Sequence, residues 1–141
     1  MDNEQQSGRM IHAVHGLSKI DPDPQFEKEL SAHLQKTHDQ DSLLALYGRF
    51  AQGLSEFDIM MRRTIWRALC RSFGDSVKIN DGVGFKHIET FEIGSSVFIG
   101  SQTYIQGRFD GHLKIGDHVW IGPQSYFDAR DLEIEEYVGW G

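Results

Sequence analysis

The chain has 141 residues, of which 39% are hydrophobic and 25% charged, enough for one domain with a buried core. Its formal net charge of -7 argues against a dedicated nucleic-acid-binding protein. One cysteine excludes an intrachain disulfide, and no apolar run is long enough for a signal peptide or a membrane span, so we expect a cytoplasmic protein.

The first half of the chain has the pattern of an arm followed by helices. Residues 1–20 are polar and mixed and are interpreted as a flexible N-terminal arm, and residues 21–72 as a helical cap. In "DPDP", Asp23 can cap a helix whose first residue is Pro24 and which runs to about Gln35.

Two further helices are predicted in the cap. The segment "DSLLALYGRFAQG" predicts a helix capped by Asp41 or Ser42 and ended by Gly53 in a left-handed turn. Ser55 and Asp58 have the spacing of a capping box at the start of a third helix. Four arginines crowd the surface of this helix: Arg62, Arg63, Arg67 and Arg71.

From Phe73 onward a six-residue repeat replaces the helical spacing, so residues 73–141 are interpreted as a second unit. Position one is aliphatic or aromatic in every stretch, position five is mostly small or apolar, and position two is often glycine. The stretches are "FGDSVK" at 73, "INDGVG" at 79, "IGSSVF" at 93, "IGSQTY" at 99, "IQGRFD" at 105, "IGDHVW" at 115, "IGPQSY" at 121 and "IEEYVG" at 134.

The repeat predicts a coil of short strands. Positions one, five and seven are separated by even numbers, so in extended chain they face the same side. Gly, Asp, Asn and Ser between them supply turns that keep that side facing inward. Each turn of the chain stacks on the one before, which gives a parallel β-solenoid.

Two interruptions of the repeat, "GRFDGH" and "DARDLE", are predicted to be short excursions from the coil. Asp131 is placed in a loop, because an inward-facing lone carboxylate would be costly. The alternative for the whole region is an antiparallel sheet with glycine turns, whose strands would vary more in length.

The hexads at 93–104 and 115–126 resemble those of the hexapeptide-repeat acyltransferase superfamily. The resemblance covers about residues 73–141, and the preceding segment is similar to the helical N-terminal caps of some sugar O-acetyltransferases. It implies a mainly β protein with a left-handed parallel β-helix, an exception to the right-handed crossover rule. It also implies a homotrimer that uses acetyl-CoA or another acyl-CoA, with active sites between subunits and a histidine as general base.

The sequence departs from this family at its end. It stops at Gly141 within a hexad, whereas members of the family carry several more turns. We therefore expect the β-helix to be truncated at its C-terminal end, and the true catalytic base could lie beyond Gly141.

Three residues are candidates for the site. His112 is the candidate general base, because it falls in the first excursion, where a groove residue could sit; a surface position is the alternative. Asp128 and Arg130 project from the second excursion and are candidate substrate-binding residues. A carboxylate can bind sugar hydroxyls, and a guanidinium can bind a phosphate or carboxylate. The alternative is that the two form a surface ion pair with each other.

Other features have open interpretations. The arginines of the third helix could bind phosphates of CoA or of a nucleotide-linked sugar, belong to a DNA-binding helix-turn-helix, or form a solvated face. Trp120, Tyr126 and Trp140 could line an acceptor groove or a subunit contact. No metal is predicted, because His87, His112 and His118 lack the spacing of a zinc site on the repeat. Cys70 is interpreted as a core residue.

The sequence and the resemblance together predict an acyl-CoA-dependent acyltransferase. Its acceptor would be a hydroxyl or amine of a sugar or glycan precursor, as in polysaccharide biosynthesis. The alternative is a non-catalytic trimeric scaffold or an inactive N-terminal fragment. No nucleic acid and no membrane span are expected.

Overall fold

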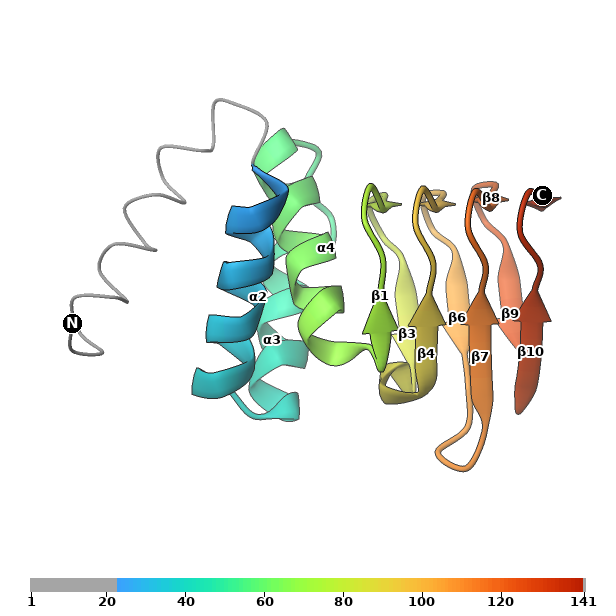
Figure 1. The fold of residues 1–141 in the computed structure, drawn as a ribbon, viewed down its shortest axis with the longest axis horizontal. Helices are drawn as coiled ribbons and strands as arrows, with labels where there is room; N and C mark the ends of the chain where they lie inside the picture. Colours follow the sequence, from blue (N-terminus) through green and yellow to red (C-terminus); the bar gives the residue numbers. More distant parts are fainter. Residues whose placement is uncertain (1–22, 141) are drawn as a thin grey trace.

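A computed structural model describes residues 23–140 of the chain, and the predicted arm over residues 1–20 lies outside that range. Three helices stand at one end, and short strands stack away from them in successive turns (Figure 1). The protein is therefore a parallel β-solenoid of about three turns preceded by a helical cap, as the hexads predicted.

The first cap helix, α2 (Pro24–Thr37), begins as predicted, with the Asp23 side chain accepting a hydrogen bond from the Gln25 amide. α3 (Gln40–Phe50) is capped by Asp39. The prediction of Asp41 or Ser42 was therefore wrong, by a few residues.

α4 (Glu56–Leu69) has the predicted capping box, in which Ser55 and Asp58 bond each other's backbone amides. The predicted left-handed turn at Gly53 is wrong, because Gly82 has the only positive φ among the glycines of residues 23–140. Gly53 is instead required for space, since a Cβ there would lie 2.2 Å from the Asp58 carboxyl group.

The coil has three parallel sheets, one on each face. We name each face by two of its neighbouring strands, which are equivalent strands of successive turns and pair with each other. The β4–β7 face contains β1 (Ser72–Phe73), β4 (Phe91–Ile93), β7 (His112–Ile115) and β10 (Asp131–Ile134). The β5–β8 face contains β2 (Lys78–Ile79), β5 (Phe98–Ile99), β8 (Trp120–Ile121) and β11 (Gly139–Trp140). The β6–β9 face contains β3 (Gly84–Lys86), β6 (Tyr104–Gln106) and β9 (Tyr126–Asp128). A 3₁₀ turn, η1 (Ile88–Thr90), joins β3 to β4.

The first residue of each hexad faces the core. In the β5–β8 face, Ile79 pairs with Ile99 and Ile99 with Ile121, and all three are fully buried. Position five is buried as well, at Val77, Val97 and Val119 and at other hexads. These columns of apolar side chains form the continuous core that a stacked repeat requires.

The corners of the coil differ from the prediction in one respect. The left-handed backbone falls on position four of the hexad, as at Ser96 with φ 58° and Gln102 with φ 64°, rather than on the glycine at position two. That glycine is needed because successive turns approach closely: a Cβ on Gly100 would lie 2.5 Å from the Pro123 nitrogen. Glycine at position two is therefore required by the close stacking of successive turns and not by a positive φ angle.

Both predicted excursions are shorter than expected. His112 begins β7, so the first excursion is reduced to residues 107–111. Asp131 begins β10 and is exposed rather than inward, so its placement in a loop was wrong. The second excursion is thus reduced to Ala129 and Arg130, because β10 pairs with β7 from its first residue.

Helix α4 closes the first end of the coil, with Ile65 and Trp66 fully buried. Arg62 is also buried, at 1% exposure, so the interpretation of a solvated arginine face is wrong for this residue. Its guanidinium donates to the carbonyl oxygens of Phe50, Gly53 and Ile79, which joins the α3–α4 connection to the first turn of the coil. Across residues 23–140, no helix has the length and apolar character needed to cross a membrane.

Candidate functional site

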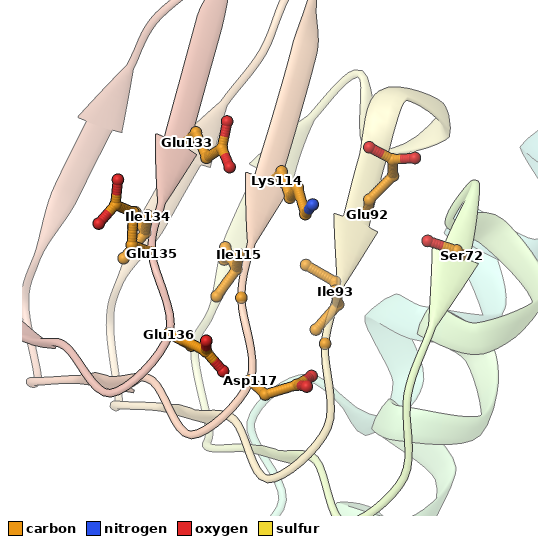
Figure 2. Close-up of a pocket in the computed structure, with 12 residues that line it drawn as sticks. Ser72, Glu92, Ile93, Lys114, Ile115, Asp117, Glu133, Ile134, Glu135 and Glu136 are labelled. Carbon is orange, nitrogen blue, oxygen red and sulfur yellow. The ribbon is translucent and has the colours of Figure 1, made fainter.

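A groove of about 570 Å³ lies on the β4–β7 face (Figure 2). The side chains of Glu92, Lys114 and Glu133 lie side by side there, because these residues pair in register on β4, β7 and β10. The other charged residues that line the groove are Asp117, Glu135 and Glu136. The groove is strongly acidic, which suits an uncharged or cationic group better than a phosphate.

The candidate base lies at the edge of this groove and contacts one of its lining residues. His112 is the first residue of β7, and its Nε2 contacts the Glu92 carboxylate on β4 of the preceding turn. This contact lowers the pKa of Glu92 below its ordinary value. An ionised Glu92 accepts a hydrogen bond from the Nε2–H group, and in that tautomer the lone pair of the imidazole lies on Nδ1.

The two candidate substrate-binding residues do not pair with each other, so that alternative was wrong. Asp128, on β9, pairs with Arg108 at 2.5 Å, and Arg130 pairs with Asp110 at 3.5 Å. Both partners belong to the loop over residues 107–111, so two ion pairs tie this loop to the next turn of the coil. Arg130 remains 64% exposed in its side chain.

The structure brings two of the three candidates together through the backbone. The amide of His112 donates to the carbonyl oxygen of Arg130 at 2.9 Å, and Asp131 pairs in register with His112. Asp128 lies on β9, the strand that precedes β10 along the chain, and forms an ion pair with Arg108. His112 thus contacts one lining residue of the acidic groove through its side chain and is joined to Arg130 through its backbone amide.

The arginines of α4 have internal partners. Arg63 forms a bidentate pair with Glu27 of α2, and Arg67 donates to the carbonyl oxygens of Phe73 and Gly74. These contacts tie the cap to itself and to the coil. The phosphate-binding and DNA-binding interpretations both need exposed guanidinium groups, whereas Arg62 is buried and the side chains of Arg63 and Arg67 are only 21% exposed.

The three aromatic candidates divide into two kinds. Trp120 stacks on Phe98 with ring centroids 5.7 Å apart, and Tyr126 stacks on Tyr104 at 5.8 Å, all on the outer surface. Trp140 instead extends the inward column above Ile121 and packs against Phe127. Its side chain nevertheless remains 49% exposed at the last turn described.

His87, His118 and Cys70 lie apart from the candidate site and each has surroundings of its own. His87 contacts Glu89, and His118 stacks on Tyr137 at 4.8 Å. Within residues 23–140, no group of three histidine, cysteine or carboxylate side chains could hold a metal ion. Cys70 is buried, and this burial raises the pKa of its thiol well above the ordinary value, as expected for an unreactive core residue.

Sequence reasoning missed Glu92, Arg108 and Asp110. Glu92 directly precedes the inward residue Ile93, so its outward position could have been read from the hexad. The contact of Glu92 with His112 could not be predicted from the hexad, because it depends on the length of the excursion between the two residues.

Comparisons with protein-family models, with curated proteins and with solved structures found no match.

Proposed function

We propose that the protein is an acyl-CoA-dependent acyltransferase, with acetyl-CoA as the donor and a hydroxyl or amine of a sugar or glycan precursor as the acceptor. The observation that carries the proposal is the His112–Glu92 contact at the edge of a groove on the rigid face of the coil. The hexads support it, because they resemble those of sugar O-acetyltransferases. Polysaccharide biosynthesis in the cytoplasm is the corresponding setting.

His112 acts as the general base in this proposal. Its Nδ1 takes the proton of the acceptor hydroxyl or amine, and the acceptor oxygen or nitrogen attacks the thioester carbonyl carbon. The carbon–sulfur bond breaks, and the imidazolium returns the proton to the leaving thiolate of CoA. Glu92 holds the ring in one tautomer and stabilises the imidazolium while it carries the proton.

The two sides of His112 suit the two substrates. The acidic groove on the β4–β7 face would take the acceptor, since its carboxylates can bind sugar hydroxyls or an ammonium group. The phosphates of the donor would lie toward Arg108 and Arg130, whose side chains are 39% and 64% exposed. Asp128 positions Arg108 for this role.

The test is release of free thiol from acetyl-CoA in the presence of a panel of sugars, amino sugars and nucleotide-linked sugars. His112→Ala should abolish acceptor-dependent release, and Glu92→Gln should reduce it by about 10-fold to 100-fold. His118→Asn is the matched control, because His118 is an outward histidine of the same turn and asparagine tolerates its positive φ. Equal rates in wild type and His112→Ala would contradict the proposal.

A second candidate is a non-catalytic assembly module. The observation that favours it is that the α4 arginines, which could have bound CoA phosphates, are used within the fold. In that case the chain would assemble with itself and show no affinity for CoA by titration calorimetry. Measurable CoA binding that weakens in Arg130→Ala would exclude it.

A further inference from the structure

A second groove lies where the helical cap meets the coil. Its volume is about 350 Å³, at the lower end of the range of small-molecule sites. We call it the cap groove, and its walls are the first turn of α2, one face of α4 and residues 75–78, the first corner of the coil. α4 stands between α2 and the first strands of the coil (Figure 1). His112, Asp128 and Arg130 do not line the cap groove, so it is separate from the candidate site.

The wall from α4 carries an acid, an aliphatic side chain and a base in that order. Glu56, Ile59 and Arg63 follow one another at spacings of three and four residues, so all three lie on one face of the helix. Val77 adds a second aliphatic side chain to the groove, and both aliphatic residues are buried. The α4 wall therefore presents opposite charges on either side of an apolar centre.

The basic end of the cap groove has donors that the fold does not use. Arg63 donates through Nε and Nη2 to Glu27, whose side chain is only 10% exposed, and this pair fixes the direction of the guanidinium. Nη1 of Arg63 has no hydrogen-bond partner within residues 23–140 and is not buried. Lys78 also lines the groove, is exposed and has no partner in that range. Two cationic groups are thus available to a carboxylate.

The acidic end of the cap groove has a carboxylate without a partner. Glu56 is the first residue of α4, is exposed, and forms no ion pair or hydrogen bond through its side chain within residues 23–140. The other acidic residues of the groove are already compensated, since Glu27 pairs with Arg63, and Asp75 pairs with one cation from each of α2 and α4. Among the described residues that line the groove, Glu56 is the carboxylate left for an ammonium group.

The spacing of the two ends sets the length of a ligand that reaches both. Glu56 and Arg63 are two helical turns apart, which separates their Cα atoms by about 10 Å along the helix axis. A charge-assisted hydrogen bond takes about 2.8 Å at each end, which leaves about 4–5 Å between the two charged groups of the ligand. An extended chain of about four bonds has this length.

We propose that the cap groove binds a small zwitterion in which a short aliphatic chain separates an ammonium group from a carboxylate, as in an ω-amino acid. The ammonium binds Glu56, the methylene groups cover Ile59 and Val77, and the carboxylate binds Nη1 of Arg63 and Lys78. An α-amino acid carries both charges on one carbon and is too short to reach both ends.

Binding in the cap groove joins the two units of the protein. Glu56 and Arg63 belong to the cap, whereas Lys78 belongs to the first turn of the coil, so the ligand contacts both. A ligand that binds only the folded protein raises its melting temperature. The inference goes beyond the proposed function, and it depends neither on the acyl-transfer chemistry nor on the candidate site.

Titration calorimetry with 4-aminobutyrate as the probe tests this site in the wild-type protein. We expect saturable binding, accompanied by a rise in melting temperature. Butyrate lacks the ammonium and butylamine lacks the carboxylate, so each should bind at least about 10-fold more weakly through the loss of one charge-assisted contact. Glycine should also bind at least about 10-fold more weakly, because its charges are too close together to make both contacts.

Two substitutions test which end binds which charge. Glu56→Gln should weaken binding of 4-aminobutyrate about 10-fold and remove the preference for it over butyrate. Lys78→Gln should also weaken binding about 10-fold and reduce the preference over butylamine. The matched controls are Asp41→Asn, in the first turn of α3, and Lys36→Gln, in the last turn of α2. Both residues are exposed and outside the groove, so these variants should bind as wild type does.

Three results would overturn the proposal: no saturable binding of 4-aminobutyrate to wild type, equal affinities for 4-aminobutyrate and butyrate, or wild-type affinity in Glu56→Gln or Lys78→Gln. Acyl transfer is measured separately, and these titrations contain no acetyl-CoA. A protein that binds 4-aminobutyrate through Glu56 but releases no thiol from acetyl-CoA would refute the proposed chemistry and leave the cap groove as a ligand site.

Discussion

Replacing Arg62 should strongly destabilise the junction between the helical cap and the coil. The buried guanidinium donates to the carbonyl oxygens of Ile79 at 2.9 Å, Phe50 at 2.8 Å and Gly53 at 2.6 Å. Methionine keeps most of the apolar length of the side chain but leaves these three acceptors without the donor. The three carbonyls come from α3, the α3–α4 connection and β2, so one side chain connects both halves of the molecule.

The magnitude follows from these contacts. A buried carbonyl left without a partner costs about 1–3 kcal/mol, although water can replace the donor at the two part-buried acceptors. Removing the guanidinium also removes its own cost of burial, which is the cause of the lowered pKa of Arg62. We therefore expect Arg62→Met to lower the free energy of unfolding by about 3 kcal/mol, or the melting temperature by about 10 °C.

Urea denaturation followed by circular dichroism measures this change. Arg71→Met is the control, because the Arg71 side chain is exposed, and its effect should stay within about 0.5 kcal/mol. An Arg62→Met variant as stable as this control would refute the role of Arg62 at the junction.

Three further predictions concern the coil. Gly100→Ala should lower the free energy of unfolding by about 1–3 kcal/mol, because the added Cβ would meet the backbone of the next turn. Gly48→Ala should raise the free energy of unfolding by about 0.5–1 kcal/mol, because Gly48 lies in α3 with open space around it. Equal effects of the two substitutions in urea denaturation would contradict the stacking argument. Ser96→Val should lower the free energy of unfolding by about 1–2 kcal/mol, because Ser96 has a φ of 58°, which a β-branched residue rarely adopts. Ser96→Asn should leave the stability nearly unchanged. Equal melting temperatures of the two variants would contradict this prediction. The depressed pKa of Glu92 contributes stability above its unfolded value near 4.5, and this contribution is lost as the pH falls through the folded value. Glu92→Gln should therefore reduce the loss of stability in acid, and an unchanged pH profile of unfolding would show that the His112 contact does not stabilise the fold.

The hexads made the coil predictable because each repeat specifies the same local arrangement. Ile93, Ile99, Ile115 and Ile121 face the core as their even spacing requires, and only a stacked coil satisfies that spacing over so many repeats. The capping box at Ser55 was predictable for the same reason, since both of its partners lie within one turn of helix.

Features that depend on neighbouring turns could not be read from a single hexad. The hexad glycines were interpreted as turn residues, but Gly100 is needed because Pro123 of the next turn comes close to it. The contact of Arg62 with Ile79 could not be predicted from the sequence either, because Ile79 is distant along the chain and accepts through its backbone carbonyl.

The candidate site was only partly predictable for a related reason. His112, Asp128 and Arg130 were found from the breaks in the repeat, but their partners depend on how many residues each break contains. The first break brings Arg108 against Asp128 and the His112 side chain against Glu92, and neither contact follows from the order of residues along the chain.

The most direct test of the proposed function is the rate of thiol release from acetyl-CoA, measured with and without sugar acceptors for wild type, His112→Ala and His118→Asn. The proposal predicts acceptor-dependent release that is retained in His118→Asn and lost by at least about 100-fold in His112→Ala. Acceptor-dependent release that persists in His112→Ala, or no acceptor-dependent release in wild type with any acceptor of the panel, would contradict it.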